Sequence, residues 1–347
     1  MSVVTKLTVQ NVRSHASYAT ALSPTVTVIT GRNGSGKTSL IEAVYVALRG
    51  TSFKGSDKDL LRQDSDWWRI DITLDDESKR TARFDPSKTT GRKQFVVDDS
   101  THYRLLPKHK YPVVLFEPDD LRLLHGSPTR RRQFIDHFIS QLDPLYYSAL
   151  RKYDRALKQR NNLLKKQIVS HDDLFVWDVA LSEYGAYIIE KRTLFIEEIN
   201  AKLNDAYNDI ADSKDIVSVH YSHTLIGDTK QKLLNELHAA QSRDRMQGTT
   251  TIGPHRHDVI FEFNTSPALT VASRGEARTI VLALKFLEVA IIEQITGQKP
   301  IILLDDVFSE LDDVRQKALS DRIRDNQILI TSTHVLSGSK NYQHIQL

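Results

Sequence analysis

The sequence predicts an α/β fold in which a mixed sheet, with a parallel core and an antiparallel part, is joined to a short helical lobe. Three observations predict this fold. A glycine-rich loop near residue 31 stands between a β-branched strand and a helix, the last third alternates strands with helices, and residues 144–166 repeat apolar side chains at helical spacing. A chain of 347 residues is long enough to form two domains.

The first third of the chain is expected to form strands around one helix. Residues 5–12 and 25–30 have strand-like patterns, and the pattern at 39–50 predicts a helix that ends at a glycine. Alternating apolar and polar residues at 68–74, 81–85 and 94–98 predict an antiparallel sheet, and 112–116 is a candidate buried strand.

The middle of the chain is expected to be a helical lobe at 127–212, inserted into a discontinuous head made of 1–126 and 213–347. Long helices are predicted at 143–166 and 178–208. In the last third, 216–223, 258–263 and 268–273 look like strands, 275–295 is a strongly apolar helix, and 301–308 and 327–333 are buried strands. Alternation of strand and helix predicts that the last third belongs to a parallel sheet.

The glycine-rich loop carries the strongest chemical signal. It fits the pattern G-x-x-x-x-G-K-[ST], and it lies between a strand and a helix as a phosphate-binding P-loop does. Glycines let backbone N–H groups converge on phosphate oxygens, Lys37 is expected to reach the β- and γ-phosphates of ATP, and Thr38 is expected to bind Mg²⁺. A glycine-rich turn that matches by chance is the alternative. The predicted nucleotide-binding residues are Gly31, Arg32, Asn33, Gly34, Ser35, Gly36, Lys37, Thr38 and Ser39.

An apolar strand at 301–304 ends in two carboxylates, Asp305 and Asp306, as a Walker B segment does. Asp305 is expected to hold the Mg²⁺ shell and Asp306 to polarise the attacking water. Adjacent residues on a strand point to opposite faces, so the backbone must bend for both carboxylates to serve one site. Taken alone, such a pair is more often a solvated strand end.

Three weaker signals follow the order of motifs in ABC-type ATPases, whose signature is normally Ser-x-Gly-Gln. Ser273, Arg274, Gly275 and Glu276 stand before an apolar helix, although Ser with Glu three residues later is also a capping box. Ser309 and Asp312 follow Asp306 as a D-loop does. His334 closes the strand at 327–333, where a histidine that senses the γ-phosphate stands in that class, although a lone histidine is usually structural. The expected fold is therefore an ABC-type P-loop ATPase head with a short helical lobe.

Basic residues are concentrated in one block. Residues 121–166 carry 11 Lys plus Arg against 3 Asp, a local net charge of +8, whereas the whole chain carries +3. These side chains are candidates for sequence-independent contacts with DNA phosphates, and the alternative is a solvated helix face. The candidate residues for DNA contact are Arg130, Arg131, Arg132, Arg151, Arg155 and Lys158.

The chain resembles the RecF family over nearly its whole length. The similar segments are GRNGSGKTSLIEAVYVALRGTSFK, PVVLFEPDDLRLLHGSPTRRRQFIDHFISQLDPLYY, IILLDDVFSELD and IGPHRHD, the last compared with the family's TGPHRDD. About 235 residues separate the P-loop from Ser273, too few for the long arms of SMC proteins.

The resemblance implies an ATP-dependent DNA-binding protein of recombinational repair, replication-fork recovery and the SOS response. It implies an ATP-driven homodimer that binds single-strand/double-strand junctions or gaps and works with RecO and RecR to load RecA. It also implies slow, DNA-stimulated ATP hydrolysis that resets the dimer. From the residues themselves, the signature is expected to complete the ATP site of a second copy, so that two ATP molecules join two chains.

Composition limits the other function classes. The chain has no cysteine, so a reducing compartment is expected, and the resemblance places the protein in the cytoplasm, associated with the nucleoid. No segment approaches the run of about 18 apolar residues that crosses a membrane. The competing hypotheses are a detached ATPase subunit of an ABC transporter and a defence-associated ABC ATPase with a fused nuclease. The RecF-like segments and the basic block disfavour the transporter subunit. The nuclease would need an additional metal-carboxylate domain, for which the sequence shows no room.

Overall fold

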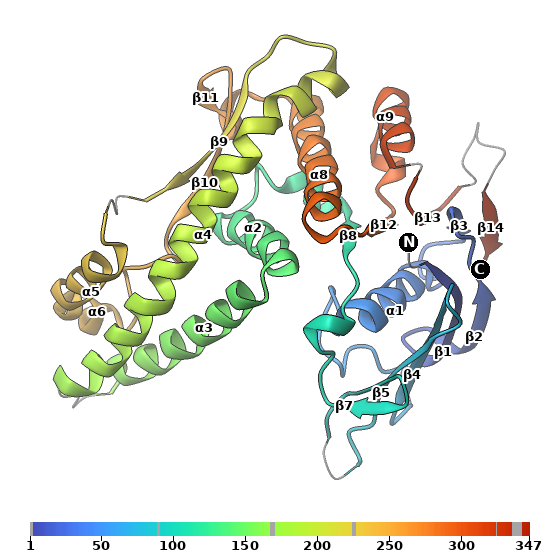
Figure 1. The fold of residues 1–347 in the computed structure, drawn as a ribbon, viewed down its shortest axis with the longest axis horizontal. Coiled ribbons are helices and arrows are strands. Elements are labelled where there is room, and N and C mark those ends of the chain that lie inside the picture. The colour runs from blue at the N-terminus through green and yellow to red at the C-terminus, as the bar shows by residue number, and fades with distance from the viewer. Residues whose placement is uncertain (1–2, 89–90, 167–170, 224–226, 324, 335–341) are drawn as a thin grey trace. The chain divides into compact units, whose positions relative to one another are not determined.

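The computed structural model describes residues 3–88, 91–166, 171–223, 227–323, 325–334 and 342–347. The chain forms two compact units (Figure 1). The first unit contains Met1–Leu121 and Glu288–Leu347, and the second contains Arg122–Leu287. No helix in the described part of the chain is long and apolar enough to cross a membrane.

A parallel sheet of short, buried strands forms one half of the first unit. Its central strands are runs of β-branched and aliphatic residues, which is typical of strands covered on both faces. Because parallel strands end at the same edge of a sheet, the loops that follow β3, β12 and β13 lie near one another. The order across the sheet is β14 (Gln343–Gln346), β3 (Val26–Thr30), β13 (Ile328–Ser332), β12 (Ile301–Asp305) and β8 (Val113–Phe116).

An antiparallel sheet forms the other half. Alternate residues of β4, among them Trp68 and Ile70, are buried, whereas Arg69 between them is exposed. The predicted antiparallel sheet at 68–98 is confirmed. Its order is β2 (His15–Ala21), β1 (Val4–Val12), β4 (Trp68–Leu74), β5 (Lys79–Phe84), β6 (Gln94–Val97) and β7 (Ser100–His102).

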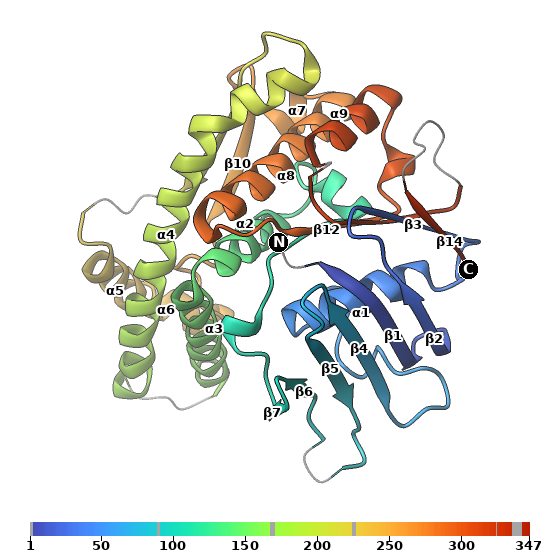
Figure 2. The same cartoon turned by 45° about the vertical axis from the view of Figure 1, so that its right-hand side comes forward.

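Helix α1 (Lys37–Arg49) joins the two sheets in one hydrophobic core. Figure 2 shows α1 against one face of the antiparallel sheet, where it contacts β1, β4 and β5. The helix ends as predicted at Gly50, whose φ of 85° lets its N–H bond to the carbonyl of Val46. A short helix, α9 (Asp313–Ile323), follows β12 and a 3₁₀ turn at Phe308–Glu310.

The second unit is mainly helical. The helical region predicted at 127–212 is confirmed over its described residues, which form α2, α3 and α4. The side chains of Ser127 and Asp143 cap α2 and α3, and in each case a proline occupies the first turn. The second predicted helix begins earlier than expected and ends later. The helices are α2 (Pro128–Leu142), α3 (Pro144–Leu164), α4 (His171–Ala211), α5 (Thr229–Ala239), α6 (Gln241–Gln247), α7 (Ala268–Val271) and α8 (Arg274–Thr296), and α8 continues into the first unit.

A small antiparallel sheet belongs to the second unit. Its order is β11 (Ser266–Pro267), β10 (Asp258–Phe263) and β9 (Val217–Ser222). The side-chain oxygens of Asn200 and Asn204 on α4 accept hydrogen bonds from the backbone N–H groups of Val219 and Val217 on the edge strand β9, at 2.9 and 2.8 Å. These bonds attach the sheet to the helical lobe.

Three expectations about the last third are therefore wrong. Strands β9 and β10 do not enter the parallel sheet, and the second unit extends to Leu287, beyond the expected lobe end at 212. Residues 268–273 do not form a strand: 268–271 are the helix α7. Pro267 pairs with Glu262 but has no N–H for a further ladder bond, so the hairpin stops and the chain turns into a helix.

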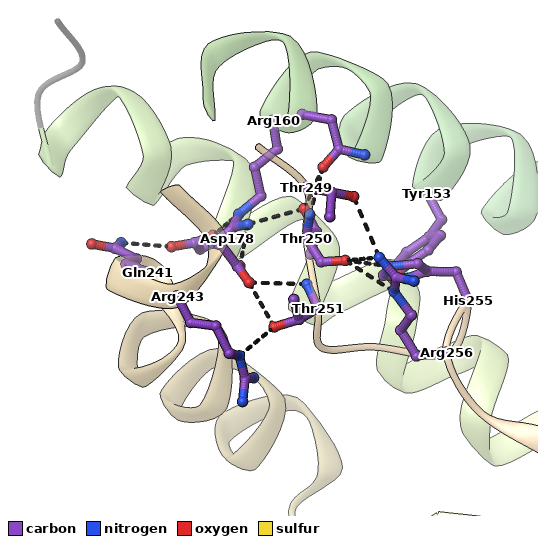
Figure 3. Close-up of polar contacts among 12 residues, drawn as sticks. Tyr153, Arg160, Asp178, Gln241, Arg243, Thr249, Thr250, Thr251, His255 and Arg256 are labelled. Atoms are coloured by element: carbon purple, nitrogen blue, oxygen red, sulfur yellow. Dashed lines mark hydrogen bonds and ion pairs between the residues drawn. The ribbon is translucent and has the colours of Figure 1, made fainter. Parts of the chain in front are cut away.

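A buried ionic cluster, the Arg160 network, joins the helices of the second unit (Figure 3). The Arg160 guanidinium donates to Asp178 on α4 and to Asp244 on α6, both at 2.6 Å, and to the Thr250 hydroxyl at 2.9 Å. All four residues have 0% exposure. Since a buried charge is costly without partners, the network fixes three segments of the chain in one arrangement.

Candidate nucleotide-binding site

The P-loop runs from the end of β3 to the start of α1. Gly34 and Gly36 have φ values of 83° and 98°, a left-handed conformation that residues with a side chain rarely adopt. At Gly36 a Cβ atom would also lie 2.4 Å from the Ser14 hydroxyl. The Ser35 hydroxyl is buried without a hydrogen-bond partner among the described residues, which fits a loop shaped to receive oxygen atoms of a ligand.

Lys37 is the first residue of α1, and its side chain folds back over the loop. Its ammonium donates to the carbonyls of Gly31 at 2.9 Å and Arg32 at 3.1 Å, and the residue is only 4% exposed. These bonds hold a positive charge beside the N-terminus of α1, where backbone N–H groups also favour an anion. The arrangement is suited to a phosphate.

Thr38 and Asp305 meet beside this loop, although 267 residues separate them. The Thr38 hydroxyl donates to Asp305 Oδ1 at 2.7 Å, and the Thr331 hydroxyl donates to the same oxygen at 2.9 Å. The other carboxylate oxygen lies 3.0 Å from the ammonium of Lys54. A hydroxyl and a carboxylate at this separation are ligands that Mg²⁺ accepts when phosphate and water complete its shell. The donor set therefore fits the expected ion.

Asp306 turns back toward the same site. Its φ of 53° is the backbone bend that the sequence required, and its N–H donates to the Thr331 hydroxyl at 2.9 Å. Burial raises the pKa of the Asp306 carboxyl above its usual value, opposed by the charge of Lys37 and supported by that of Asp305. Asp306 lines a cleft of about 410 Å³ together with Asn33, Gly34, Gly36, Lys37, Thr38, Ser39, Arg13 and Ser14.

Sequence patterns missed Arg13, Ser14, Lys54 and Thr331. Arg13 holds its place through a hydrogen bond of 2.9 Å to Glu42, a carboxylate on α1 with no exposure. Arg13 follows the end of β1, and Thr331 belongs to the buried strand β13, so neither stands in a recognisable motif. Of these four residues, only Lys54 belongs to a RecF-like segment, the one at 31–54.

The candidate signature forms a reciprocal capping box at the start of α8. The backbone N–H of Ser273 donates to the Glu276 carboxylate at 2.6 Å, and the Glu276 N–H donates to the Ser273 hydroxyl at 3.3 Å. Ser273 and Arg274 are exposed, and Gly275 lies within the first turn. The capping alternative is therefore present in the structure. A capping box at an exposed helix terminus is compatible with a role in anion binding.

Two further candidates follow the parallel strands. His334 is exposed, two residues beyond β13, and its N–H donates to the Ser332 hydroxyl at 3.1 Å. Asp312 accepts a bond from the Arg315 N–H at 3.0 Å and caps α9. The structure describes the backbone of Ser309 but not its side chain.

The six candidate DNA residues fall into different environments. Arg131 is buried, forms two bonds to Asp258 at 2.9 and 2.7 Å and donates to two carbonyls, so its guanidinium is committed to packing. Arg132 donates to the His257 carbonyl at 2.6 Å. Arg130 is half-buried in the first turn of α2. Arg151, Arg155 and Lys158 lie exposed along α3.

The IGPHRHD segment packs inside the second unit. His255 Nδ1 lies 2.7 Å from the Tyr153 hydroxyl, and its Nε2 lies 3.1 Å from the Thr250 carbonyl. Burial lowers the pKa of His255 to about 4, and burial with the nearby Arg192 charge lowers that of His257 to about 3. Both rings are therefore neutral at pH 7.

The chain matches one protein family along almost all its length. The family model described as RecF/RecN/SMC N terminal domain matches residues 3–343. The DNA replication and repair protein RecF of Streptococcus agalactiae serotype V is 34% identical over 350 residues, which cover 95% of this chain and 91% of that protein. The protein of the same name from Lachnoclostridium phytofermentans is 33% identical over 341 residues, with coverage of 95% and 92%.

Solved structures also resemble this chain. One described as the recombination mediator protein RecF-ATP in the RecFOR pathway superposes with a TM-score of 0.87 at 29% identity and covers 97% of this chain and 94% of its own. The Smc head domain of Pyrococcus furiosus gives a TM-score of 0.51 at 17% identity, with coverage of 96% and 90%, which speaks for the fold alone. The predicted fold class is confirmed.

Proposed function

We infer the function from one premise: this chain belongs to the RecF family, within the RecF/RecN/SMC group. It is therefore an ATP-binding protein of DNA replication and repair with an SMC-like ATPase head. Beyond this, we propose an ATP-driven homodimer that binds DNA at single-strand/double-strand junctions or gaps and hydrolyses ATP slowly to reset itself.

One observation carries the ATP-binding step: the P-loop lysine, the Thr38–Asp305 pair and Asp306 converge on one cleft in the first unit. Lys37 binds the β- and γ-phosphates, and the glycines of the loop admit them close to the backbone. Thr38 and Asp305 would hold Mg²⁺, which would neutralise charge at the phosphates. Asp306 orients and polarises the attacking water, and His334 contacts the γ-phosphate.

Dimerisation depends on the exposed capping box of α8. In this proposal the Ser273 hydroxyl, Arg274 and the Gly275 backbone bind the γ-phosphate held by the second copy, while the Glu276 carboxylate caps the helix. Asp312 belongs to the proposed D-loop. Two such contacts, related by two-fold symmetry, make ATP part of the interface. Hydrolysis removes the γ-phosphate and with it the attachment, so the dimer is coupled to the nucleotide state.

DNA binding relies on the exposed face of α3. Arg151, Arg155 and Lys158 are available to phosphates, whereas the paired guanidiniums of Arg131 and Arg132 support the fold of the lobe. Contacts of this kind carry no base sequence and weaken with salt. Partnership with RecR and RecO in RecA loading, and a place in the cytoplasm with the nucleoid, follow from the family premise.

The central test is the mass of a hydrolysis-blocked Asp306→Asn protein in solution. Light scattering with Mg²⁺ and ATP is expected to give a dimer, and the protein without nucleotide a monomer. Only monomers at saturating ATP would contradict the mechanism. Adding Ser273→Arg is expected to preserve ATP binding and abolish the dimer, because the serine acts on the other copy's nucleotide.

DNA contact is tested by charge reversal on α3. Arg155→Glu is expected to weaken duplex binding and to reduce the salt dependence of the affinity. Lys214→Glu, at an exposed lysine outside the α3 face, is the matched control and should bind as the unmodified protein does. Equal loss in both variants would show a non-specific charge effect. A transporter subunit would bind no DNA at all.

A further inference from the structure

A second pocket lies on the antiparallel sheet, and it shares no lining residue with the nucleotide cleft. It has a volume of about 300 Å³, at the lower end of the range for small-ligand sites. Four of its lining residues form one row across adjacent strands: Gln10 is paired with Arg69, Arg69 with Arg83, and Arg83 with Gln94. We call it the Trp67 pocket, after the aromatic residue at its edge.

The row faces away from the core of its unit. Trp68, Phe84 and Phe95, the sequence neighbours of these residues, are buried at 5% exposure or less, whereas Arg69 and Arg83 are exposed. Since successive residues of a strand point to opposite faces, the row lies on the outer face of the sheet, opposite the face that carries α1. With strands about 4.8 Å apart, four residues span about 14 Å, which is longer than one nucleotide.

The pocket is strongly basic. Arg69, Arg83, Lys88 and Arg92 line it, against a single acidic residue, Asp85. Arg69 pairs with Asp71, and Lys88 with Asp85 at 3.4 Å. Among the described residues, Arg83 and Arg92 form no ion pair, and Arg83 Nε donates only to the Gln94 amide oxygen at 3.0 Å.

Arg69 and Arg83 lie directly opposite each other on adjacent strands, where like charges repel, and the Asp71 carboxylate compensates Arg69 only. Their position is favourable once an anion lies between them, because a guanidinium binds phosphate through several parallel N–H groups. The charge pattern therefore indicates a phosphate ligand.

Trp67 adds an aromatic surface to this basic wall. It directly precedes β4, and 42% of the residue is exposed. Nucleobases stack on exposed aromatic rings irrespective of sequence, and adjacent arginines hold the phosphates of the same strand. Trp67 with Arg83 and Arg92 supplies both parts of that recognition.

We propose that the Trp67 pocket binds an unpaired nucleotide of single-stranded DNA, with the base on Trp67 and its phosphate on Arg83 and Arg92. The proposal rests on the DNA-binding function above and assigns it a separate contact for the single strand. A free nucleotide offers the same chemistry. The strand is favoured because the polar row extends beyond one nucleotide.

The test compares the affinities of three fluorescent ligands by anisotropy with ATP present: a dT20 strand, a 20-base-pair duplex and dTMP. Trp67→Ala and Arg83→Ala are each expected to weaken dT20 binding about tenfold, since one stacked base or one phosphate contact is lost, and to leave duplex binding within twofold. Tyr103→Ala removes an exposed aromatic outside the pocket, and Lys79→Ala an exposed cation on the same strand as Arg83. Both controls should behave as the unmodified protein.

A spectroscopic arm separates contact from structural damage. Tryptophan fluorescence should fall when dT20 binds, and this quenching should be absent in Trp67→Phe. If Trp67→Ala and Arg83→Ala bind dT20 as tightly as the unmodified protein does, and duplex still binds, this inference is wrong and the proposed function stands. If dTMP binds as tightly as dT20 and only dTMP binding is lost in the variants, the ligand is a free nucleotide and the proposal fails. Absence of all DNA binding by the unmodified protein defeats the proposed function as well.

Discussion

The nucleotide cleft of the first unit and the Arg160 network of the second are both made of charged residues, but they are organised in opposite ways. In the cleft, Lys37 and Asp306 line a space of about 410 Å³, and Asp305 is bonded to Thr38 at its wall. In the network, Arg160 bonds directly to Asp178 and Asp244, with no exposure at any of the three. The cleft charges border an open space, whereas the network charges contact one another.

This contrast shows how the role of a charged motif can be inferred. Both regions contain segments with RecF-like sequence, since the P-loop forms the cleft and IGPHRHD packs beside the Arg160 network. Resemblance alone cannot separate ligand binding from folding. The decisive difference is whether the charged groups border an open cleft or are buried directly against one another. On this criterion, changes in the network should alter stability, and changes in the cleft should alter affinity.

The largest effect is expected from Arg160→Met. It leaves Asp178 and Asp244 buried without their cation, so the free energy of unfolding should fall by about 3–5 kcal/mol. Urea denaturation measures this loss. Lys158→Met, at an exposed position of the same helix, should change stability by less than about 0.5 kcal/mol. An equally stable Arg160→Met protein would remove the contrast between the two regions.

Lys37→Met should lower the affinity for ATP and leave the stability of the protein nearly unchanged. Loss of charge-assisted hydrogen bonds to the phosphates is worth about 1.5–3 kcal/mol, so ATP affinity measured by calorimetry should fall about 10- to 150-fold. Stability without nucleotide should change by less than about 1 kcal/mol, because the methionine retains most of the buried chain. Global unfolding of this variant would mean that Lys37 mainly holds the loop together.

Acid should weaken the second unit through His255 and His257. Their pKa values of about 4 and about 3 lie below the ordinary 6.5, so the unfolded chain binds more protons below pH 6.5. Their contribution is complete above pH 6.5 and declines toward the folded pKa values. From pH 6.5 to 5.5 the loss should be about 1 kcal/mol for each histidine.

Urea unfolding between pH 6.5 and 5.5 measures how steeply the free energy of unfolding falls as the pH falls. His257→Gln should make the slope shallower, and the matched control His125→Gln, at an exposed position, should leave it unchanged. A slope that is identical in all three proteins would place the protonation elsewhere.

The smallest effect concerns the ion pair of Lys54 with Asp305. Lys54 is partly exposed and competes with Mg²⁺ for the carboxylate, and such a pair is worth less than about 1 kcal/mol. Lys54→Met should therefore lower the Mg²⁺ concentration that half-saturates ATP binding by up to about fivefold. A higher requirement for Mg²⁺ would instead indicate that Lys54 contacts the nucleotide.

The sequence alone determined the features that depend on spacing within a short segment. The P-loop, the apolar strand before Asp305, the α1 cap at Gly50 and the alternation in β4 are local patterns, and the structure contains all of them. The bend at Asp306 followed from strand geometry alone and is present as a positive φ.

Contacts between distant segments of the chain depend on the tertiary structure. Thr331 and Lys54 join the site because β13 and the loop after α1 pass beside Asp305, and no periodicity encodes that contact. Arg131 and Arg155 look alike in a basic sequence, but one is buried against Asp258 and the other faces solvent. The 268–273 segment has a strand-like pattern yet turns into a helix after Pro267 ends the ladder. Each outcome depends on contacts between residues that are far apart in the sequence. The packing of the whole chain determines those contacts.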